Sequence, residues 1–215
     1  MLVLATMMSE GFQVSIVIPA LNEEAAILAV TKTIKEATDK LGVAYELILV
    51  DDGSTDKTGE LMDNFARTET AIPTMVIHNP TPRNIGYVFW QGVQKARGHY
   101  VVLVAGDNEI TREALMNLFS EIGKYDLVIS YPVNTEVRSW QRRIISRVYV
   151  FIFNTLFRTR LRYFNGSCLI RLDLIRLLPQ WTSGFAYMSE ILVQLVKKGV
   201  TYKEIPAPLC DFLPH

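Results

Sequence analysis

Cysteine is scarce in this chain, and no hydrophobic run is long enough to cross a membrane. Cys168 and Cys210 form neither a disulfide framework nor a metal-binding spacing, which favours a reduced, cytoplasmic setting. The longest apolar stretch, residues 148–157, is interrupted by Asn154 and has about half of the length that a spanning helix requires. These absences exclude a disulfide-stabilised domain and a chain that crosses a membrane by itself.

Acidic residues are missing from residues 137–172, a segment that has eight arginines and no lysine. The whole chain has 22 basic and 22 acidic residues, so the remainder is acidic, with 14 basic residues against 22 acidic ones. Such an asymmetry indicates a partner for the basic segment. The alternative is an ordinary solvated helix face.

The length and composition predict one domain. With 215 residues, 49% of them apolar, the chain can build a substantial core. Residues 1–12 are expected to form a frayed leader, because the first eight are apolar but carry no basic segment and are too short for a secretory signal. A single domain is expected over residues 13–215.

Apolar runs alternate with apolar residues at helical spacing through the first 131 residues, as in a sheet of parallel strands connected by helices. This pattern predicts an α/β fold with a doubly wound, mostly parallel sheet. The predicted strands are 14–18, 45–50, 75–77, 100–104 and 127–129, and the predicted helices are 23–41, 56–66, a third ending near 97, and 111–122. Beyond residue 131 we expect a helix over 139–157, a short irregular stretch, a helix over 185–198 and a strand over 200–205.

Polar clusters follow the first two predicted strands. Residues 19–24 follow the first, and residues 51–56, which include Asp51, Asp52 and Asp56, follow the second. One such cluster could be an ordinary turn with a helix cap. Adjoining carboxylates repel each other, however, unless a ligand hydroxyl, a donor-rich base or a metal uses them. Because both clusters lie at strand ends, they predict a binding site for something small and polar.

These residues also resemble a known family. Residues 14–24 and 51–56, the Asn84-x-Gly86 loop and residues 98–107 are similar to glycosyltransferase family 2, and within it to the polyprenyl-phosphate (dolichol-phosphate) sugar transferases. The resemblance spans about residues 14–205. It implies a glycosyltransferase A-type fold and an inverting hexosyltransferase with a nucleotide-diphosphate-sugar donor. A polyprenyl phosphate at the cytoplasmic face of the membrane is one candidate acceptor.

The resemblance divides the chain into a nucleotide-binding half, about 13–132, and an acceptor- or membrane-facing half, about 133–215. In the first half Asp52 would hold the base, and glycine lets the backbone approach the ligand closely. The positions assigned to the donor in this way are Pro19, Ala20, Asn22, Glu23, Asp51, Asp52, Ser54, Arg83, Gly86 and Gly106.

The fourth predicted strand departs from the family pattern. The family has Asp-x-Asp there, whose carboxylates hold Mg²⁺ or Mn²⁺ against the diphosphate, but this chain has Ala105-Gly106-Asp107. Asp107 and Glu109 are the expected metal ligands, with Asp107 also a catalytic candidate, because Mg²⁺ often rests on one or two carboxylates plus substrate phosphates. The alternatives are a catalytically silent nucleotide-sugar-binding relative and an Asp107 that only caps a helix.

The resemblance also assigns phosphate-binding arginines to the second half. Arginine binds phosphate through a bidentate fork and suits an anionic membrane surface, so Arg142, Arg143 and Arg147 are candidates for an acceptor phosphate and peripheral membrane contact. The same predicted helix carries an apolar stripe, which the simpler interpretation assigns to the core. This stripe comprises Trp140, Ile144, Val148, Phe151 and Ile152.

Glu190 occupies the place of a family carboxylate near the acceptor and is a catalytic candidate. The alternative is a polar helix face that Glu190 shares with Tyr187, Gln194 and Lys197. Residues 164–168 lack the acidic residue that the family has at that place, which weakens the expected acceptor contacts there.

Other classes are disfavoured. No Gly-x-Gly-x-x-Gly follows the first predicted strand, which argues against a dinucleotide-binding domain. No nucleic-acid partner is expected. His78, His99 and His215 have no ligand-like spacing, so they are assigned no role.

Overall fold

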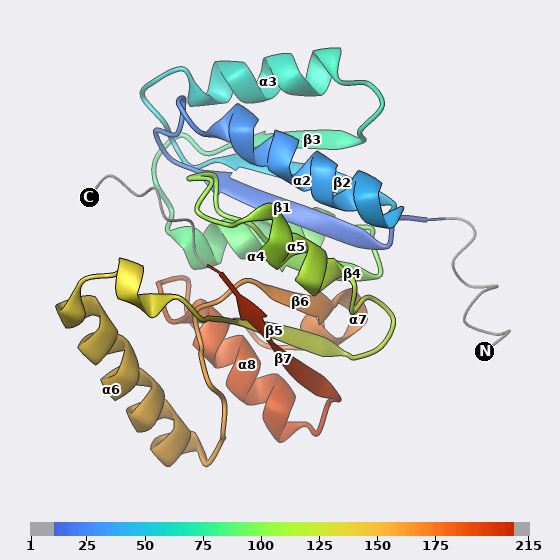
Figure 1. Cartoon of the computed structure of the whole chain (residues 1–215). Helices are drawn as coiled ribbons and strands as arrows, with labels where there is room; N and C mark the ends of the chain where they lie inside the picture. The colour runs from blue at the N-terminus through green and yellow to red at the C-terminus, as the bar shows by residue number, and fades with distance from the viewer. Residues whose placement is uncertain (1–10, 209–215) are drawn as a thin grey trace, which may run out of the picture.

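The computed structural model describes residues 11–208, whose strands form one seven-stranded sheet in the order β3-β2-β1-β4-β6-β5-β7 (Figure 1). Cys210, His215 and most of the expected leader lie outside the described residues. The strands are β1 (Val14–Ala20), β2 (Tyr45–Asp51), β3 (Thr74–His78), β4 (Tyr100–Leu103), β5 (Leu127–Pro132), β6 (Cys168–Arg171) and β7 (Tyr202–Ala207). The helices are α2 (Ile27–Leu41), α3 (Thr58–Thr68), α4 (Ile85–Lys95), α5 (Arg112–Phe119), the short 3-10 turn η1 (Thr135–Val137), α6 (Trp140–Phe157), α7 (Leu172–Ile175) and α8 (Tyr187–Lys197).

The doubly wound, mostly parallel sheet expected from the sequence is confirmed. Strands β1 to β4 are parallel neighbours, and the apolar runs of β1, β2 and β4 are buried because helices cover both faces, whereas the edge strand β3 is only partly buried. Ala20 pairs with Asp51, and Asp51 pairs with His78, so three strands end at one level. This register delivers the polar clusters that follow them to one edge of the sheet.

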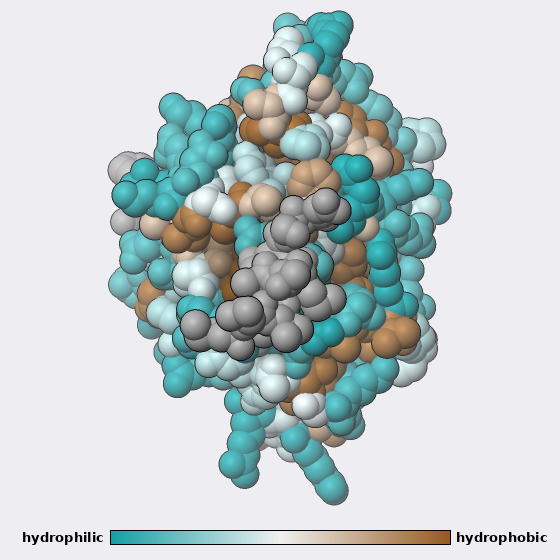
Figure 2. Space-filling view, turned by 90° about the vertical axis from the view of Figure 1, so that its right-hand side faces the viewer, coloured by the Kyte–Doolittle hydropathy of each residue, from teal (hydrophilic) through white to brown (hydrophobic). Residues whose placement is uncertain are grey.

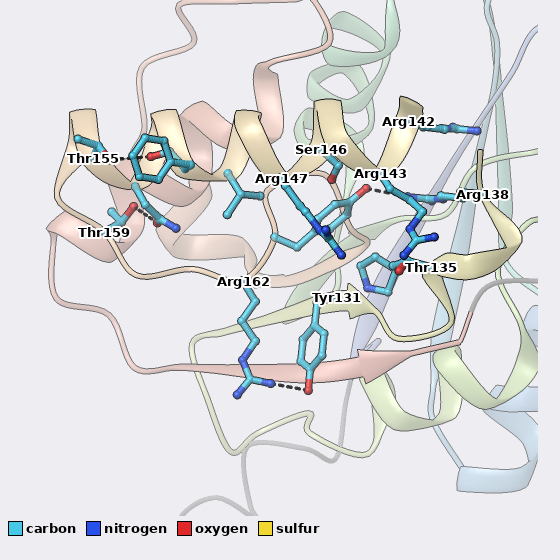
Figure 3. Close-up of a pocket in the computed structure, with 15 residues that line it drawn as sticks. Tyr131, Thr135, Arg138, Arg142, Arg143, Ser146, Arg147, Thr155, Thr159 and Arg162 are labelled. Carbon is cyan, nitrogen blue, oxygen red and sulfur yellow. Dashed lines mark hydrogen bonds between the residues drawn. The ribbon is translucent and has the colours of Figure 1, made fainter. Parts of the chain in front are cut away.

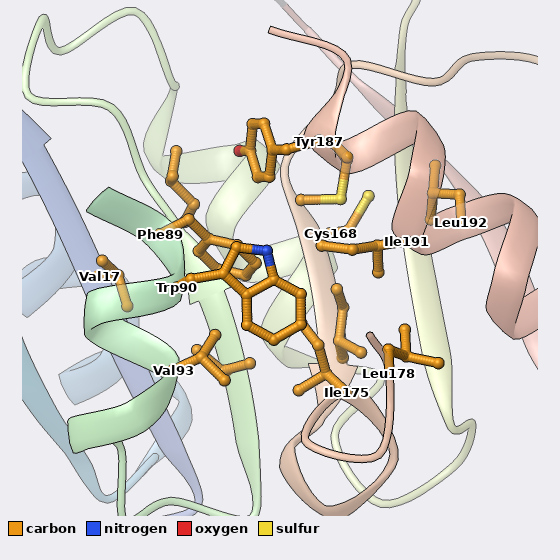
Figure 4. Packing of buried hydrophobic residues seen from close by; sticks show 14 of the residues in the cluster. Val17, Phe89, Trp90, Val93, Cys168, Ile175, Leu178, Tyr187, Ile191 and Leu192 are labelled. Carbon is orange, nitrogen blue, oxygen red and sulfur yellow. The ribbon is translucent and has the colours of Figure 1, made fainter. Parts of the chain in front are cut away.

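Two apolar layers hold the helices against the sheet. Helices α2, α3 and α5 pack on one face, and α4, α7 and α8 pack on the other (Figure 4). Gly92 of α4 lies directly against Val17 of β1, where an added Cβ would come within 2.4 Å of the Val17 Cγ2 atom. The absence of a side chain at this position therefore sets how closely α4 approaches the sheet.

The region expected to be a short irregular stretch contains a strand and a helical turn, so that prediction was wrong. Strand β6 pairs antiparallel with both β4 and β5, and α7 follows it directly. Strand β7 then pairs in parallel with β5, and it begins and ends two residues later along the chain than the predicted strand. These strands extend the same sheet into the second half of the chain.

Helix α2 begins later than the sequence predicts. Residues 22–26 form a loop because their amides bind the neighbouring loop: the Glu23 N–H donates to the Thr58 hydroxyl at 2.8 Å and the Glu24 N–H to Asp56 at 3.2 Å. Asp56 also accepts from the Thr58 N–H at the start of α3. These bonds join the two polar clusters.

Helix α6 lies beside the sheet and has no fully buried residue (Figure 1). Its inner side places Tyr149, Phe153 and Phe157 against the core, whereas the expected apolar stripe faces outward. Trp140 and Phe151 are 67% and 70% exposed, and Ile144, Val148 and Ile152 are about half exposed. Assigning this stripe to the core was therefore wrong. Among the described helices, none has the length and apolar character needed to cross a membrane.

Candidate active site at the carboxyl ends of the strands

The loops after β1 and β2 form one continuous surface. The Asn22 N–H donates to the Ser54 hydroxyl at 3.0 Å, and the Asn22 side-chain oxygen accepts from the Thr55 N–H at 2.8 Å. Asn22 has a positive φ of 58°, a conformation that asparagine adopts more readily than most residues. The Asp52 N–H donates to the Ala20 carbonyl at 2.9 Å. The structure thus brings together Ala20, Asn22, Asp52 and Ser54 as the sequence predicts.

Asp52 is a buried carboxylate that holds the loop before α4. Its two oxygens accept from the Arg83 N–H at 2.9 and 3.0 Å, and one oxygen also accepts from the Asn79 amide at 2.9 Å. Asn79 in turn exchanges two amide hydrogen bonds with Gln91 of α4. A carboxylate has about four lone-pair sites, so Asp52 retains capacity for a ligand donor. Asp52 therefore connects the end of β2 to Arg83, a further candidate donor residue in the loop that precedes Gly86.

Asp51 has a different set of partners. One oxygen accepts from the Ser54 N–H at 2.9 Å and the other lies 3.0 Å from the Nδ1 of His78, whose Nε2 lies 3.1 Å from Asp63. Burial raises the pKa of Asp51, but the hydrogen bonds from Ser54 and His78 outweigh it and the net shift is downward. The same contact with Asp51 raises the pKa of His78. Sequence reasoning assigned His78 no role, although its position at the end of the strand beside β2 could have indicated this pair.

The turn after β4 packs tightly on the end of β1. The Gly106 N–H donates to the Pro19 carbonyl at 3.0 Å, and a Cβ at Gly106 would lie 2.9 Å from the Ala20 Cβ. One oxygen of Asp107 accepts from the Glu109 N–H at 3.1 Å. Partial burial, followed by the negative charge of Asp107, raises the pKa of the Glu23 carboxyl. The carboxylates of this turn therefore lie close to the negative charge of Glu23.

The carboxylates in this turn suit a metal only with help from a ligand. Among residues 11–208, no group of three or more Asp, Glu, His or Cys residues is arranged to hold a metal ion. Asp107 and Glu109 supply hard oxygen ligands of the kind that Mg²⁺ and Mn²⁺ accept, and Mg²⁺ commonly completes its shell with phosphate oxygens and water. The two carboxylates therefore fit a metal that a diphosphate also holds.

A cavity of about 280 Å³ joins this turn to the basic half of the chain. Asp107 and Glu109 line it together with Arg138 and Arg142. Arg138 donates to the Tyr163 hydroxyl at 3.2 Å, while its Nε is buried without a hydrogen-bond partner among the described residues. Sequence reasoning included Arg138 in the basic run but did not select it as a candidate. Its position at the start of that run was the only available signal.

The other candidate arginines line a second cavity of about 610 Å³ along α6 (Figure 3). Arg143 and Arg147 project from the helix toward Tyr131 and Arg162 on the opposite wall, and Arg142 lies at the end that meets the first cavity. Arg162 donates to the Tyr131 hydroxyl at 2.7 Å. None of the described residues that line this cavity is acidic. The structure thus gathers Arg142, Arg143 and Arg147 at one basic groove.

Glu190 is directed to a loop instead of to these cavities. Its two carboxylate oxygens accept from the backbone N–H groups of Trp181 and Thr182, each at 2.9 Å, and Gln194 donates to it at 3.2 Å. Tyr187 is buried, with 6% of its surface exposed, so it does not share an exposed polar face with Glu190. The catalytic role expected for Glu190 remains a prediction.

Solved structures of similar fold include glucosyl-3-phosphoglycerate synthase from Mycobacterium tuberculosis. Its complex with uridine diphosphate has a TM-score of 0.71 and 21% sequence identity, and the match covers 95% of this chain and 73% of that chain. Its complex with Mn²⁺, UDP-glucose and phosphoglyceric acid matches with a TM-score of 0.70 and 20% identity, over 95% and 73% of the two chains. The fold is therefore the glycosyltransferase A-type fold that the sequence implied.

The family follows from the sequence comparisons. The model for glycosyl transferase family 2 matches residues 15–177, more than half of the chain, so the chain belongs to this family. Similar proteins include the undecaprenyl-phosphate 4-deoxy-4-formamido-L-arabinose transferases of Pseudomonas paraeruginosa, 33% identical over 60% of this chain and 38% of that protein, and of Pseudomonas fluorescens, 28% identical over 84% and 56%. The chain thus spans between about two fifths and just over half of these relatives.

Proposed function

We propose that this domain transfers a sugar, with inversion at the anomeric carbon, from a nucleotide-diphosphate-sugar to the phosphate of a polyprenyl lipid. The observation that carries the proposal is the cavity lined on one side by Asp107 and Glu109 and on another by Arg138 and Arg142. Carboxylates can position a metal-bound diphosphate, and arginines can bind an acceptor phosphate. The names of the curated relatives, which include undecaprenyl phosphate, support this choice of acceptor.

The donor nucleoside would lie on the joined loops after β1 and β2. There Asp52 offers lone pairs to N–H or hydroxyl donors of the base and ribose, while Pro19, Ala20 and Glu23 border the same surface. Asp51 would act indirectly, because its oxygens already bind Ser54 and His78. A uridine nucleotide is the first choice for testing, since the solved structures of similar fold contain one.

Asp107 and Glu109 would hold the divalent cation. When bound, Mg²⁺ or Mn²⁺ compensates the negative charge that develops on the departing diphosphate. The protein would orient these carboxylates, because the hydrogen bond from the Gly106 N–H to the Pro19 carbonyl fixes the turn on the end of β1, close to the expected nucleoside. Ala105 removes one family carboxylate, so the site depends on oxygens from the substrate.

The acceptor would use the basic groove along α6. Arg142, Arg143 and Arg147 would bind the lipid phosphate, whose oxygen attacks the anomeric carbon while the bond to the leaving diphosphate breaks. A phosphate is already ionised at neutral pH, so the attack needs little help from a general base. The exposed apolar stripe of α6 would rest on the membrane surface beside these arginines, as interfacial helices do.

The proposal is tested with the purified chain and a panel of nucleotide-sugars. Thermal stabilisation by one nucleotide class identifies the donor, and release of nucleoside diphosphate with undecaprenyl phosphate in detergent identifies the reaction. Asp107→Asn is the matched control, because it keeps the shape of the side chain and removes its charge. Release that needs the lipid and is lost in Asp107→Asn supports the proposal. Failure of every nucleotide-sugar to bind would overturn it.

A catalytically silent nucleotide-sugar-binding protein is the second candidate, and Ala105 is the observation that favours it.

We expect Mn²⁺ to bind the free protein weakly and to bind at least tenfold more tightly with uridine diphosphate present, because the diphosphate supplies missing ligands. Ala105→Asp should tighten Mn²⁺ in both cases. Calorimetric titration measures these affinities. An Mn²⁺ affinity that ignores the nucleotide, or full turnover in excess chelator, would contradict the proposed metal site.

A further inference from the structure

The segment between α7 and α8 carries two large apolar side chains into solvent. Trp181 and Phe185 are 74% and 71% exposed, and residues 179–186 have no regular secondary structure. Phe185 also lines the cavity that contains Asp107 and Arg138. The conformation of this segment, residues 181–185, therefore determines the shape of one wall of the candidate active site.

Glu190 holds this segment from the first turn of α8. Each of its carboxylate oxygens accepts one backbone N–H, from Trp181 and from Thr182, at 2.9 Å. Hydrogen bonds to an ionised acceptor are about twice as strong as neutral ones. Gln194, one helical turn later, donates to Glu190 and fixes its orientation. The carboxylate is thus engaged with two consecutive amides of the segment.

The other side of the segment is held by the start of α4. The Gly86 N–H donates to the Ser183 carbonyl at 3.0 Å, and a Cβ at Gly86 would lie 2.6 Å from that carbonyl oxygen. Gly86 follows the Arg83 loop that Asp52 holds. The segment is therefore fixed between α8 and the loop that borders the expected donor, and Phe185 lies at its end.

We propose that Glu190 is a positioning residue, which fixes residues 181–185 so that Phe185 forms one wall of the reaction cavity. The inference rests on the proposed function. It differs from the general-base role expected from the sequence, because both oxygens of Glu190 hold backbone amides and Glu190 does not line the cavity around Asp107. Loss of Glu190 should then release the segment and weaken substrate binding, whereas loss of a base would slow the chemical step.

The first experiment measures hydrogen exchange of residues 181–184 in the free protein. Glu190→Ala should speed exchange of the Trp181 and Thr182 amides by tenfold or more. Glu190→Gln keeps one carbonyl acceptor and should give an intermediate rate. Gly184→Ala is the matched control within the segment, because a Cβ there meets only the Thr182 hydroxyl at 3.7 Å. Equal exchange in wild type and both Glu190 variants would overturn the proposal.

The second experiment separates positioning from base catalysis by steady-state kinetics. For a positioning role, Glu190→Gln should raise the KM of donor or acceptor severalfold, change kcat less than tenfold and leave the pH profile of kcat unchanged. Gly86→Ala, which pushes on Ser183 from the other side, should raise KM in the same way. If Glu190 were a general base, Glu190→Gln would instead lower kcat by roughly 10²- to 10⁴-fold and remove one limb of the pH profile. That result would overturn the positioning role, whereas an inactive wild type would contradict the proposed function and leave the exchange result standing.

Discussion

Asp52 combines two tasks in one buried side chain, because it holds the Arg83 loop and faces the expected nucleoside. Asp52→Ala removes the acceptor for the Arg83 N–H and the Asn79 amide together with any ligand contact. A hydrogen bond to a charged group contributes about 1.5–3 kcal/mol, so we expect uridine diphosphate to bind about tenfold to a hundredfold more weakly. Isothermal titration calorimetry measures this change.

Asp52→Asn is the informative comparison, because its single amide oxygen can replace only one of the two carboxylate oxygens. Its affinity should lie between those of wild type and Asp52→Ala. Circular dichroism melts of both variants establish that the fold is retained. An unchanged affinity in a folded Asp52→Ala protein would remove Asp52 from the binding site.

His78 predicts a pH-dependent contribution to stability. Its hydrogen bond with Asp51, opposed by partial burial and supported by Asp63, raises its pKa above the ordinary value of 6.5. A group with a raised folded-state pKa stabilises the fold below its unfolded pKa and loses that contribution as pH rises through the folded pKa. The free energy of unfolding of wild type should therefore exceed that of His78→Gln most clearly between pH 5.5 and 6.5, and the difference should shrink above this range.

Urea unfolding at half-unit steps from pH 5.5 to 8.5 measures that difference. His99→Gln is the matched control, because His99 is exposed and, among the described residues, forms hydrogen bonds only through its backbone. A difference between wild type and His78→Gln that is constant over the whole range would show that protonated His78 does not hold Asp51.

At the level of secondary-structure elements, α6 combines a basic groove with an exposed apolar stripe. Replacing Arg142, Arg143 and Arg147 with Gln should weaken sedimentation with anionic liposomes more than tenfold at low salt, since each basic residue contributes roughly 1 kcal/mol near such a surface. The effect should shrink as salt shortens the Debye length from about 30 Å at 0.01 M to about 8 Å at 0.15 M. Nucleotide affinity should stay unchanged, because the proposed nucleoside surface lies on the loops after β1 and β2.

A second triple variant controls for net charge. Lys32 and Lys40 are exposed on α2 and Lys57 is exposed just before α3, and both helices lie away from α6 (Figure 1). Replacement of these lysines with Gln removes the same charge. It should leave liposome binding close to wild type. If both triple variants sediment alike at every salt concentration, α6 is not a membrane-binding surface.

The sequence predicted most elements because their signals are local. The buried parallel strands are apolar runs and the helices repeat apolar residues at helical spacing, so only their boundaries shifted. Strand β6 was missed because it has four residues, Cys-Leu-Ile-Arg, too few to show a period. Its existence depends on pairing with β4 and β5, which local patterns do not encode. The exposure of the apolar stripe on α6 could not be predicted either, because such a stripe has the same spacing in the sequence whether another element covers it or not.

The candidate site was predictable where residues adjoin at strand ends. Asn22 and Asp52 belong to the polar clusters that follow the first two strands, whereas the role of Asp107 was assigned by the family resemblance; the register of the sheet brings these strand ends to one edge. The pairing of His78 with Asp51 was indicated only by the place of His78 at a strand end, and that of Glu190 with the Trp181 amide was not predictable, because residues 179–186 have no regular secondary structure. Arg138 was not selected because the sequence does not show that, like Arg142, it lines the cavity that contains Asp107.

At the scale of the whole molecule, one sheet and the apolar layers on its two faces cross both halves of the chain. The apolar layer that contains Val17 of β1 also contains Cys168 and Ile191 from the second half (Figure 4). Separate unfolding of either half would expose that shared layer.

At the opposite edge of the sheet, where the parallel strands begin, hydrophilic and apolar residues are interspersed on the surface (Figure 2).

We therefore expect residues 13–215 to unfold as one domain. Differential scanning calorimetry should show a single transition whose calorimetric and van't Hoff enthalpies agree to within about 10%. Ile191→Ala and Val17→Ala, which remove side chains from the shared layer in different halves, should each lower the midpoint of that single transition. Two resolved transitions, or a variant that shifts only part of the heat absorption, would show that the halves are independent domains.

The place of β6 in the sheet also constrains the order in which the chain can fold as a ribosome makes it. Strands β1 to β4 pair among themselves and are complete once Leu103 has been added. Strand β5 joins them only through β6, which is made about forty residues later in the sequence, and β7 joins through β5. During synthesis the candidate nucleotide-binding edge can therefore form while α6 and its arginines still belong to an unattached segment, and the cavity between the two halves closes last.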